Sequence, residues 1–234
     1  MHTAFVKNIP ADGAVVELEK REFDHLFKTL RCRAGERLRL CDGNGTVAEA
    51  EATADRCIKV LSQQTFAPDE IELHLFAALP KNAKLDALLK PVTEAGVKSI
   101  TPLKCRYSVS EKSEIPERWY TLLEEACKQS GNPFLPEINQ TMTVAQAVEY
   151  CQNNGITIFY GAQHGILLLP ETLQNGNIKK MAWMVGPEGG FDENESALLD
   201  SAGKGITLGK YIFRLENAAL AGAAYLLTIA RSGE

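Results

Sequence analysis

The first 67 residues contain short runs in which apolar or β-branched residues alternate with polar ones. Alternation with a period of two is typical of strands that bury only one face. The predicted strands span residues 3–6, 14–19, 37–41, 46–52 and 57–63.

Two local patterns complete this region. Residues 42–45 read Asp-Gly-Asn-Gly between two of the strands, and they predict a hairpin turn because such residues readily adopt positive φ. Residues 21–30 place four large apolar side chains on one side and predict a helix. Residues 1–67 are therefore predicted to form a small β-barrel with one helix.

Beyond Pro68 the pattern changes, because predicted strands now alternate with predicted helices. This order is typical of an α/β domain with a largely parallel sheet. We predict a domain boundary after residue 67, with domains at 1–67 and 68–234. The predicted strands span residues 71–79, 98–103, 156–160, 181–185 and 205–208, and the predicted helices span residues 85–95, 115–130, 144–153 and 216–231.

Two glycine-bearing loops follow predicted strands near the C-terminus. The first has the sequence Gly-Pro-Glu-Gly-Gly at residues 186–190, and the second occupies residues 208–214. We expect them to lie side by side at the carboxyl edge of the parallel sheet, where α/β proteins bind ligands. Asp192 and Glu195 have the spacing of a capping box, so a helix is predicted to begin at Asp192. The other interpretation of the first loop is a simple turn between strand and helix.

Neither loop matches a known nucleotide fingerprint, because no Gly-Lys-Ser/Thr follows and the spaced dinucleotide pattern is missing. Arg214 and Glu216 stand at the start of the last helix. They suit a site that handles an anion, or they are a surface charge and a helix-stabilising carboxylate. That helix is apolar nearly all round, which favours either a core helix or a dimer interface.

Composition sets limits on the class of protein. The 234 residues are 45% hydrophobic, with no run as long as a membrane span. The six cysteines have no metal-binding spacing, and the N-terminus lacks a signal-peptide pattern. We therefore expect no membrane partner, no metal and a cytoplasmic location.

The net charge of −5 hides two basic segments. Residues 20–39 carry seven basic against three acidic residues, and residues 79–106 carry six against two. Local basic segments of this kind are the footprint of RNA binding. On charge alone, however, two ordinary solvated faces are the more common explanation.

The motifs together resemble the RsmE family of ribosomal RNA uridine methyltransferases, which belong to the knotted SPOUT superfamily. The most specific segments are Gly-Pro-Glu-Gly-Gly-Phe at residues 186–191 and Leu-Gly-x-x-Ile-x-Arg-x-Glu-x-Ala at residues 208–218. His-Leu-x-x-x-Leu-Arg at residues 25–31 is similar to the family's PUA-like RNA-binding domain. The resemblance implies an α/β chain with an N-terminal PUA-like barrel. It also implies a C-terminal SPOUT domain with a deep trefoil knot at about 156–234.

The resemblance also implies a reaction and a ligand. Members of the family are homodimers that methylate N3 of a uridine, position 1498, in the 16S rRNA of the small ribosomal subunit. The implied cofactor is S-adenosyl-L-methionine, held mainly by backbone. The cofactor-binding residues implied are Gly161, Gly186, Pro187, Glu188, Gly189, Gly190, Leu208, Gly209, Tyr211, Ile212 and Phe213.

The resemblance implies catalytic roles for two residues. Arg214 would stabilise a uridine anion. Glu216 would position Arg214 or accept the N3 proton. Basic residues of the first domain would contact RNA phosphates. The implied RNA-binding residues are Arg21, Lys28, Arg31 and Arg33.

The chain departs from the family at Leu215 and Asn217, where hydroxyl-bearing residues are usual. Two alternatives therefore stay open. One is a SPOUT methyltransferase with another RNA target, and the other is an inactive RNA-binding or assembly protein.

Overall fold

The computed structural model describes residues 1–79, 85–108, 115–168, 170–175 and 177–232. The chain divides into two compact units. The first comprises Met1–Pro68 together with Leu123–Leu135, and the second comprises Asp69–Leu122 together with Pro136–Glu234. The first unit therefore includes a segment that lies far from it in the sequence.

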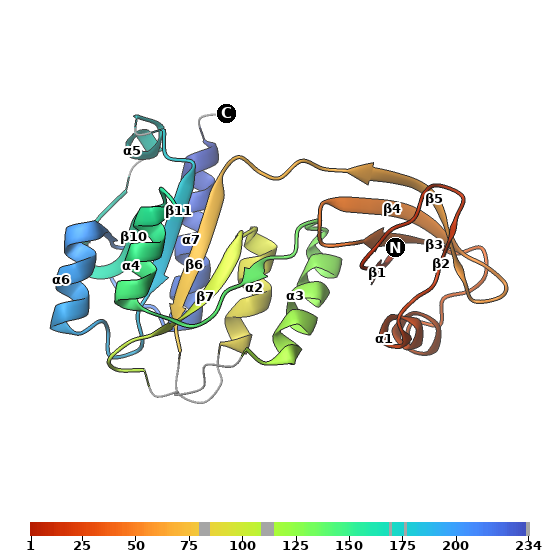
Figure 1. Cartoon of the computed structure of the whole chain (residues 1–234), viewed down its shortest axis with the longest axis horizontal. Coiled ribbons are helices and arrows are strands. Elements are labelled where there is room, and N and C mark those ends of the chain that lie inside the picture. Colours follow the sequence, from red (N-terminus) through yellow and green to blue (C-terminus); the bar gives the residue numbers. More distant parts are fainter. Residues whose placement is uncertain (80–84, 109–114, 169, 176, 233–234) are drawn as a thin grey trace. The chain divides into compact units, whose positions relative to one another are not determined.

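The first unit is built on a five-stranded sheet in the order β1-β3-β4-β5-β2 (Figure 1). β1 pairs parallel with β3, and the other neighbours are antiparallel. Five strands were expected here, but the second is much shorter than residues 14–19 because it faces only Lys59 and Ile58 of β5. The strands are β1 (His2–Phe5), β2 (Val15–Val16), β3 (Arg37–Cys41), β4 (Thr46–Ala52) and β5 (Ile58–Thr65).

The predicted helix of the first unit has two parts. α1 (Lys20–Phe23) continues directly into η1 (Asp24–Thr29), a π-helical turn. Leu26 is fully buried in the core with Leu38 and Leu40, which are inward-facing residues of β3. The apolar face was therefore predicted correctly, whereas the wider π turn leaves no signal in the pattern of apolar positions.

The predicted hairpin turn connects β3 and β4. The Asp42 carboxylate accepts hydrogen bonds from the backbone N–H groups of Asn44 (2.8 Å) and Thr46 (2.9 Å). Gly45 has a φ of 97°, and a Cβ there would stand 2.8 Å from the ring of Phe134. Only glycine allows both that backbone conformation and that contact. The turn is thereby packed against the second segment of this unit.

The second unit contains a sheet in the order β12-β10-β11-β6-β7-β8, in which every neighbouring pair is parallel. A short strand, β9, also pairs with β7. The strands are β6 (Glu72–Ala78), β7 (Ser99–Lys104), β8 (Glu137–Ile138), β9 (Met142–Thr143), β10 (Thr157–Ile166), β11 (Lys180–Val185) and β12 (Gly203–Ile206). The parallel α/β prediction is confirmed, and the two-residue strands β8 and β9 were not expected from the sequence.

Helices lie on both faces of this sheet (Figure 1). α7 packs on β6 and β11 and against α2, whereas α4 packs on β7 and β10 and against α6. Gly96 ends α2 with a φ of 90°, as predicted for a left-handed C-cap. The helices are α2 (Asp86–Ala95), α3 (Glu117–Ser130), α4 (Val144–Asn153), α5 (Pro170–Asn175), α6 (Glu193–Ala202) and α7 (Leu215–Arg231).

α7 is not buried all round, contrary to one sequence interpretation. Gly222 lies against the fully buried indole of Trp183, and the indole N–H donates to the Ala218 carbonyl at 3.0 Å. This close approach fixes one face of the helix on the sheet. The opposite line, which includes Leu220 and Ala224, is exposed.

The end of β10 crosses very close to β12. A Cβ on Gly165 would stand 2.6 Å from the Ile206 carbonyl carbon, and the Thr207 N–H donates to the Ile166 carbonyl at 3.0 Å. Two backbone segments can approach this closely only where one side chain is missing. The trefoil knot implied by the family resemblance remains a prediction.

All six cysteines are free thiols, and five of them are buried. Burial is the main cause that raises the pKa of Cys41, Cys105, Cys127 and Cys151 to about 12. These four thiols stay protonated at neutral pH and are poor nucleophiles.

Candidate functional site

The carboxyl ends of β7, β10, β11 and β12 bring the loops that follow them to one edge of the sheet. Both glycine-bearing loops are among them, after β11 and β12. They are not direct neighbours, however, because β10 runs between those two strands. Gly161 of β10 pairs with Ile206 and follows Tyr160, which pairs with Met184. Gly161 therefore lies at the level where the two loops begin.

The first loop, residues 186–190, is tightly folded. The Gly190 N–H donates to the Pro187 carbonyl at 2.8 Å and closes a turn. The ring of Phe191 covers Gly186, since a Cβ there would stand 3.2 Å from ring atoms. Pro187 is buried, whereas Glu188, Gly189 and Gly190 are exposed. The loop thus presents glycine backbone to solvent while its ends are fixed.

The helix after this loop is capped as predicted. The Asp192 side chain accepts from the Glu195 N–H at 2.7 Å, and the Glu195 side chain accepts from the Asp192 N–H at 3.0 Å. The other oxygen of Glu195 accepts a hydrogen bond from the Arg106 N–H at 2.8 Å. One carboxylate therefore connects the start of α6 to the loop after β7.

Tyr160, a buried residue of β10, packs against Phe191 at the end of the first loop. The Tyr160 ring meets Phe191 edge to face, with ring centroids 6.5 Å apart. Its hydroxyl donates to the Asp200 carboxylate of α6, and a Cβ on Gly205 would stand 2.9 Å from that hydroxyl oxygen. Burial and this carboxylate raise the pKa of Tyr160 to about 12, so the hydroxyl stays a donor.

The second loop is far more open. Tyr211, Ile212 and Phe213 are 78%, 81% and 44% exposed. The Thr207 hydroxyl donates to the Gly209 carbonyl at 3.1 Å, and the Lys210 ammonium lies 5.6 Å from the centre of the Tyr211 ring. Three adjacent large apolar side chains exposed to water make this loop a candidate contact surface.

Arg214 and Glu216 stand at the first turn of α7. Arg214 is the N-cap residue and is exposed, and Glu216 is partly buried. Leu215 between them is only 5% exposed and anchors the helix start in the core. A carboxylate in the first turn also complements the positive end of the helix dipole.

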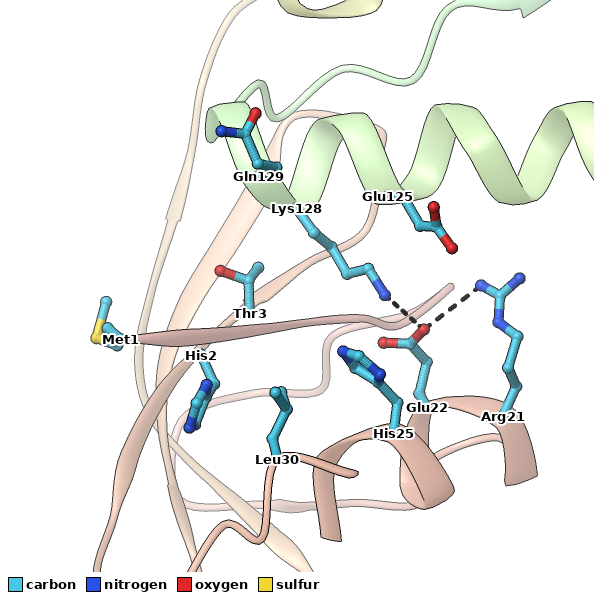
Figure 2. A pocket seen from close by; sticks show the side chains of 10 residues that line it. All are labelled: Met1, His2, Thr3, Arg21, Glu22, His25, Leu30, Glu125, Lys128 and Gln129. Carbon is cyan, nitrogen blue, oxygen red and sulfur yellow. Dashed lines mark hydrogen bonds and ion pairs between the residues drawn. The ribbon is translucent and has the colours of Figure 1, made fainter. Parts of the chain in front are cut away.

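The first unit has a pocket of about 430 Å³, shown in Figure 2. Glu22, which is 4% exposed, lies between Arg21 and Lys128. Its carboxylate accepts from the Lys128 ammonium at 2.7 Å and from the Phe5 N–H at 3.0 Å. The pocket is lined by Met1, His2, Thr3, Arg21, Glu22, His25, Leu30, Glu125, Lys128 and Gln129.

The structure places the four predicted RNA-binding residues in different settings. Arg21 forms ion pairs with Glu22 and with Glu124, and Lys28 pairs with Asp24 at 2.7 Å. Arg31 and Arg33 are both exposed, and Arg31 has a positive φ of 56°. The charges of Arg21 and Lys28 are therefore partly compensated by their own neighbours.

Comparison with known proteins identifies the family. Residues 67–227 match the model of an RNA methyltransferase domain, and residues 18–55 match that of an RNA methyltransferase PUA domain. The ribosomal RNA small subunit methyltransferase E of Rickettsia conorii is 30% identical, covering 94% of this chain and 92% of that protein. The chain belongs to the small subunit methyltransferase E family.

Two further comparisons agree. The ribosomal RNA small subunit methyltransferase E of a Synechocystis species is 27% identical, covering 86% of this chain and 69% of that protein. The crystal structure of the Neisseria gonorrhoeae methyltransferase E bound to S-adenosyl methionine has a TM-score of 0.84 and 25% identity. It covers 98% of both chains. In the described residues of the present chain, no helix has the length and hydropathy of a membrane span.

Sequence reasoning missed two parts of this candidate site. The loop after β7 reaches the same edge through Arg106 and Tyr107, and Tyr160 supports the first glycine loop from within the sheet. The strand order would have placed the first at this edge, because all parallel strands end there. The sequence contains no comparable signal for the contact between Tyr160 and Asp200, which are 40 residues apart.

Proposed function

We propose that this chain transfers a methyl group from S-adenosyl-L-methionine to N3 of a uridine in the 16S rRNA of the small ribosomal subunit. The observation that carries the proposal is the agreement of fold over 98% of the chain with a methyltransferase E bound to S-adenosyl methionine. The two glycine-bearing loops of this chain lie at the carboxyl edge where a ligand is expected.

The residues at this edge suit the cofactor. Exposed glycine backbone at Gly189 and Gly190 allows a ligand to approach closely. The apolar side chains of residues 211–213 offer a cover for an adenine ring. Gly161, Leu208 and Gly209 would complete the cradle. When bound, the cofactor supplies an electrophilic methyl group on a sulfonium.

Uridine sets a specific chemical demand. N3 carries a proton, and its electron pair becomes available only when that proton leaves. The resulting negative charge is shared by O2 and O4. A guanidinium close to these oxygens stabilises the anion, which is the role we assign to Arg214. Glu216, two residues further along the chain, positions that guanidinium or accepts the proton.

The RNA and a second copy of the chain would occupy other surfaces. Exposed Arg31 and Arg33 suit phosphate contacts that position the RNA without reading its sequence. The exposed line of α7 around Leu220 and Ala224 suits a homodimer contact. Sedimentation equilibrium tests the dimer, and a single species of monomer mass at assay concentration contradicts it.

Methyl transfer from labelled S-adenosylmethionine to small ribosomal subunits that lack the modification tests the reaction. Nucleoside mass spectrometry should find 3-methyluridine, at position 1498 by the family resemblance. Arg214→Ala should lower the rate by about 10²-fold with an unchanged melting temperature. The rate of Arg214→Lys should fall between those of the wild type and Arg214→Ala, because lysine keeps the positive charge and loses the planar guanidinium.

Lys204→Ala is the matched control, because it removes one exposed positive charge from β12 outside the loop. Full activity of Arg214→Ala would contradict the role given to Arg214. Transfer to a different nucleoside would favour another RNA target. Absence of both transfer and cofactor binding would favour the non-catalytic RNA-binding alternative.

A further inference from the structure

Residues 105–108, directly after β7, form an anchored turn. The Cys105 N–H donates to the Ser108 hydroxyl at 3.0 Å, and the Ser108 N–H donates back to the Cys105 carbonyl at 3.0 Å. Between them, the Arg106 N–H donates to the Glu195 carboxylate at 2.8 Å. Tyr107 is thus held on a short turn that is tied to the start of α6.

This anchored turn places a large aromatic side chain beside the first glycine loop. Tyr107 is 54% exposed, and its ring begins 3.5 Å from the position that a Cβ on Gly189 would take. A tyrosine ring carries a large apolar surface, and covering its exposed part would contribute free energy to binding. An exposed ring on a fixed turn suits a ligand that covers it.

The strand order places Tyr107 relative to the proposed cofactor cradle. The proposed cofactor cradle is formed by the loops after β10, β11 and β12, which lie on one side of the sheet. Tyr107 follows β7, which lies on the other side of β11 with β6 between them. The ring therefore stands next to the cradle but outside it. Such a position suits the acceptor for a transferred methyl group.

We propose that Tyr107 is a substrate-contacting residue whose ring stacks on an unpaired nucleobase of the RNA at the acceptor site. This inference rests on the proposed function. Proteins recognise single-stranded RNA mainly by stacking its bases on aromatic side chains, and every base offers such a face. The exposed Arg106 beside it suits a phosphate of the same nucleotide.

Three substitutions separate stacking from other roles. Tyr107→Ala should lower kcat/KM for small ribosomal subunits by about 5- to 150-fold, the range for losing one stacked base. Tyr107→Phe should stay within twofold of the wild type because it keeps the ring. Tyr107→Leu should resemble Tyr107→Ala, since it keeps apolar area without an aromatic face.

Three measurements on the same variants provide the counter-tests. The dissociation constant for S-adenosylmethionine, the melting temperature and the oligomeric mass should not change. A cofactor affinity that falls by the same factor as kcat/KM would make Tyr107 part of the cradle and overturn the inference. So would a changed oligomeric mass, or a Tyr107→Leu variant with wild-type activity. Tyr120→Ala, at a 42% exposed tyrosine on α3, is the control and should behave as wild type.

The same assay separates this inference from the proposed function. If the wild type itself transfers no methyl group, the proposed reaction fails. Stacking is then tested by filter binding of the wild type and Tyr107→Ala to the same small subunits. Weaker binding of the variant supports the RNA contact, and equal binding overturns it.

Discussion

The two glycine-bearing loops of the second unit end parallel strands of one sheet, yet they are held in very different ways. The first is fixed by the Phe191 ring, by the capping box at Asp192 and by the Glu195 link to Arg106. The second extends three large apolar side chains into solvent, with Ile212 81% exposed. The first loop is preorganised by its own chain, whereas no equivalent cover of the second loop is found among the described residues.

This difference suggests a division of labour. A preorganised loop loses little conformational freedom when a ligand binds, so its contacts contribute fully to affinity. An exposed apolar loop gains stability only when something covers it. We therefore expect substitutions near the first loop to change stability and affinity together. Substitutions in the second loop should change affinity alone.

The largest expected effect comes from the contact that positions α7, and with it the end of the second loop. A Cβ on Gly222 would stand 2.1 Å from the Trp183 indole. Gly222→Ala should lower the free energy of unfolding by about 2–3 kcal/mol through overpacking, despite the better helix propensity of alanine. Urea unfolding measures this change.

Two variants show whether the indole causes that loss. Gln152→Ala on the exposed side of α4 should stay within about 0.5 kcal/mol of the wild type. Trp183→Phe should cost less in the Gly222→Ala background than alone, because the smaller ring relieves the clash. Additive effects in this cycle would exclude the Trp183 contact as the cause.

The second-largest effect is expected in the second loop, where affinity should change without stability. Ile212→Thr should leave the free energy of unfolding within about 0.5 kcal/mol, because the side chain is already in water. It should weaken S-adenosylmethionine binding about three- to tenfold, since roughly 1 kcal/mol of apolar burial is lost in the complex. Calorimetric titration measures this affinity.

Val15→Thr is the matched control, at an exposed β-branched residue of the first unit. It should change neither stability nor cofactor affinity. A loss of stability in Ile212→Thr equal to its loss of affinity would show that the second loop is braced after all.

Signals that act over a few residues were predictable from the sequence. The turn at residues 42–45, the stop at Gly96 and the capping box at Asp192 all depend on hydrogen bonds and φ angles within five residues. Apolar periodicity likewise located the main strands and helices, because burial of one face produces it. Interactions between residues close in the sequence therefore predict most of the helices and strands.

Contacts between distant segments were not predictable in the same way. The capping residue Glu195 also binds the N–H of Arg106, 89 residues earlier, and no local pattern announces that second bond. The strand order puts β10 between the two loops that were expected to be adjacent. Arg21, predicted as an RNA contact, pairs with Glu124, which is 103 residues away.

A smaller effect tests how much of the first loop's order comes from this long-range bond. Glu195→Gln leaves one acceptor oxygen for the two N–H groups of Asp192 and Arg106. It should cost about 1 kcal/mol of unfolding free energy. It should also raise the KM for small ribosomal subunits several-fold, because the Tyr107 turn loses an anchor.

Glu193→Gln removes an exposed charge from the same helical turn without touching these bonds. It should keep the wild-type KM and lose only the small dipole contribution of its charge, about 0.3–1 kcal/mol at most. If both variants lose the same stability and keep the same KM, helix electrostatics rather than the Arg106 link explains the role of Glu195.

The smallest effect lies in the sheet that both loops share, away from its carboxyl edge. His74 of β6 is 8% exposed, with Nδ1 2.8 Å from the Ser99 hydroxyl and Nε2 3.7 Å from the Glu72 carboxylate. Burial lowers its pKa, and Glu72 only partly offsets this. The unfolded chain therefore binds a proton more readily than the folded chain.

Stability due to neutral His74 should thus be fully present above the unfolded pKa of about 6.5 and should be lost as the pH falls below it. One proton limits the slope to about 1.4 kcal/mol per pH unit. His74→Gln should flatten the wild-type decline in unfolding free energy between pH 7 and 5, whereas exposed His164→Gln should not. Because His74 is remote from both loops, cofactor affinity at pH 7 should not change in His74→Gln. A changed affinity would mean that the sheet transmits its packing to the loops, and the contrast between a braced and an exposed loop would then depend on the whole sheet.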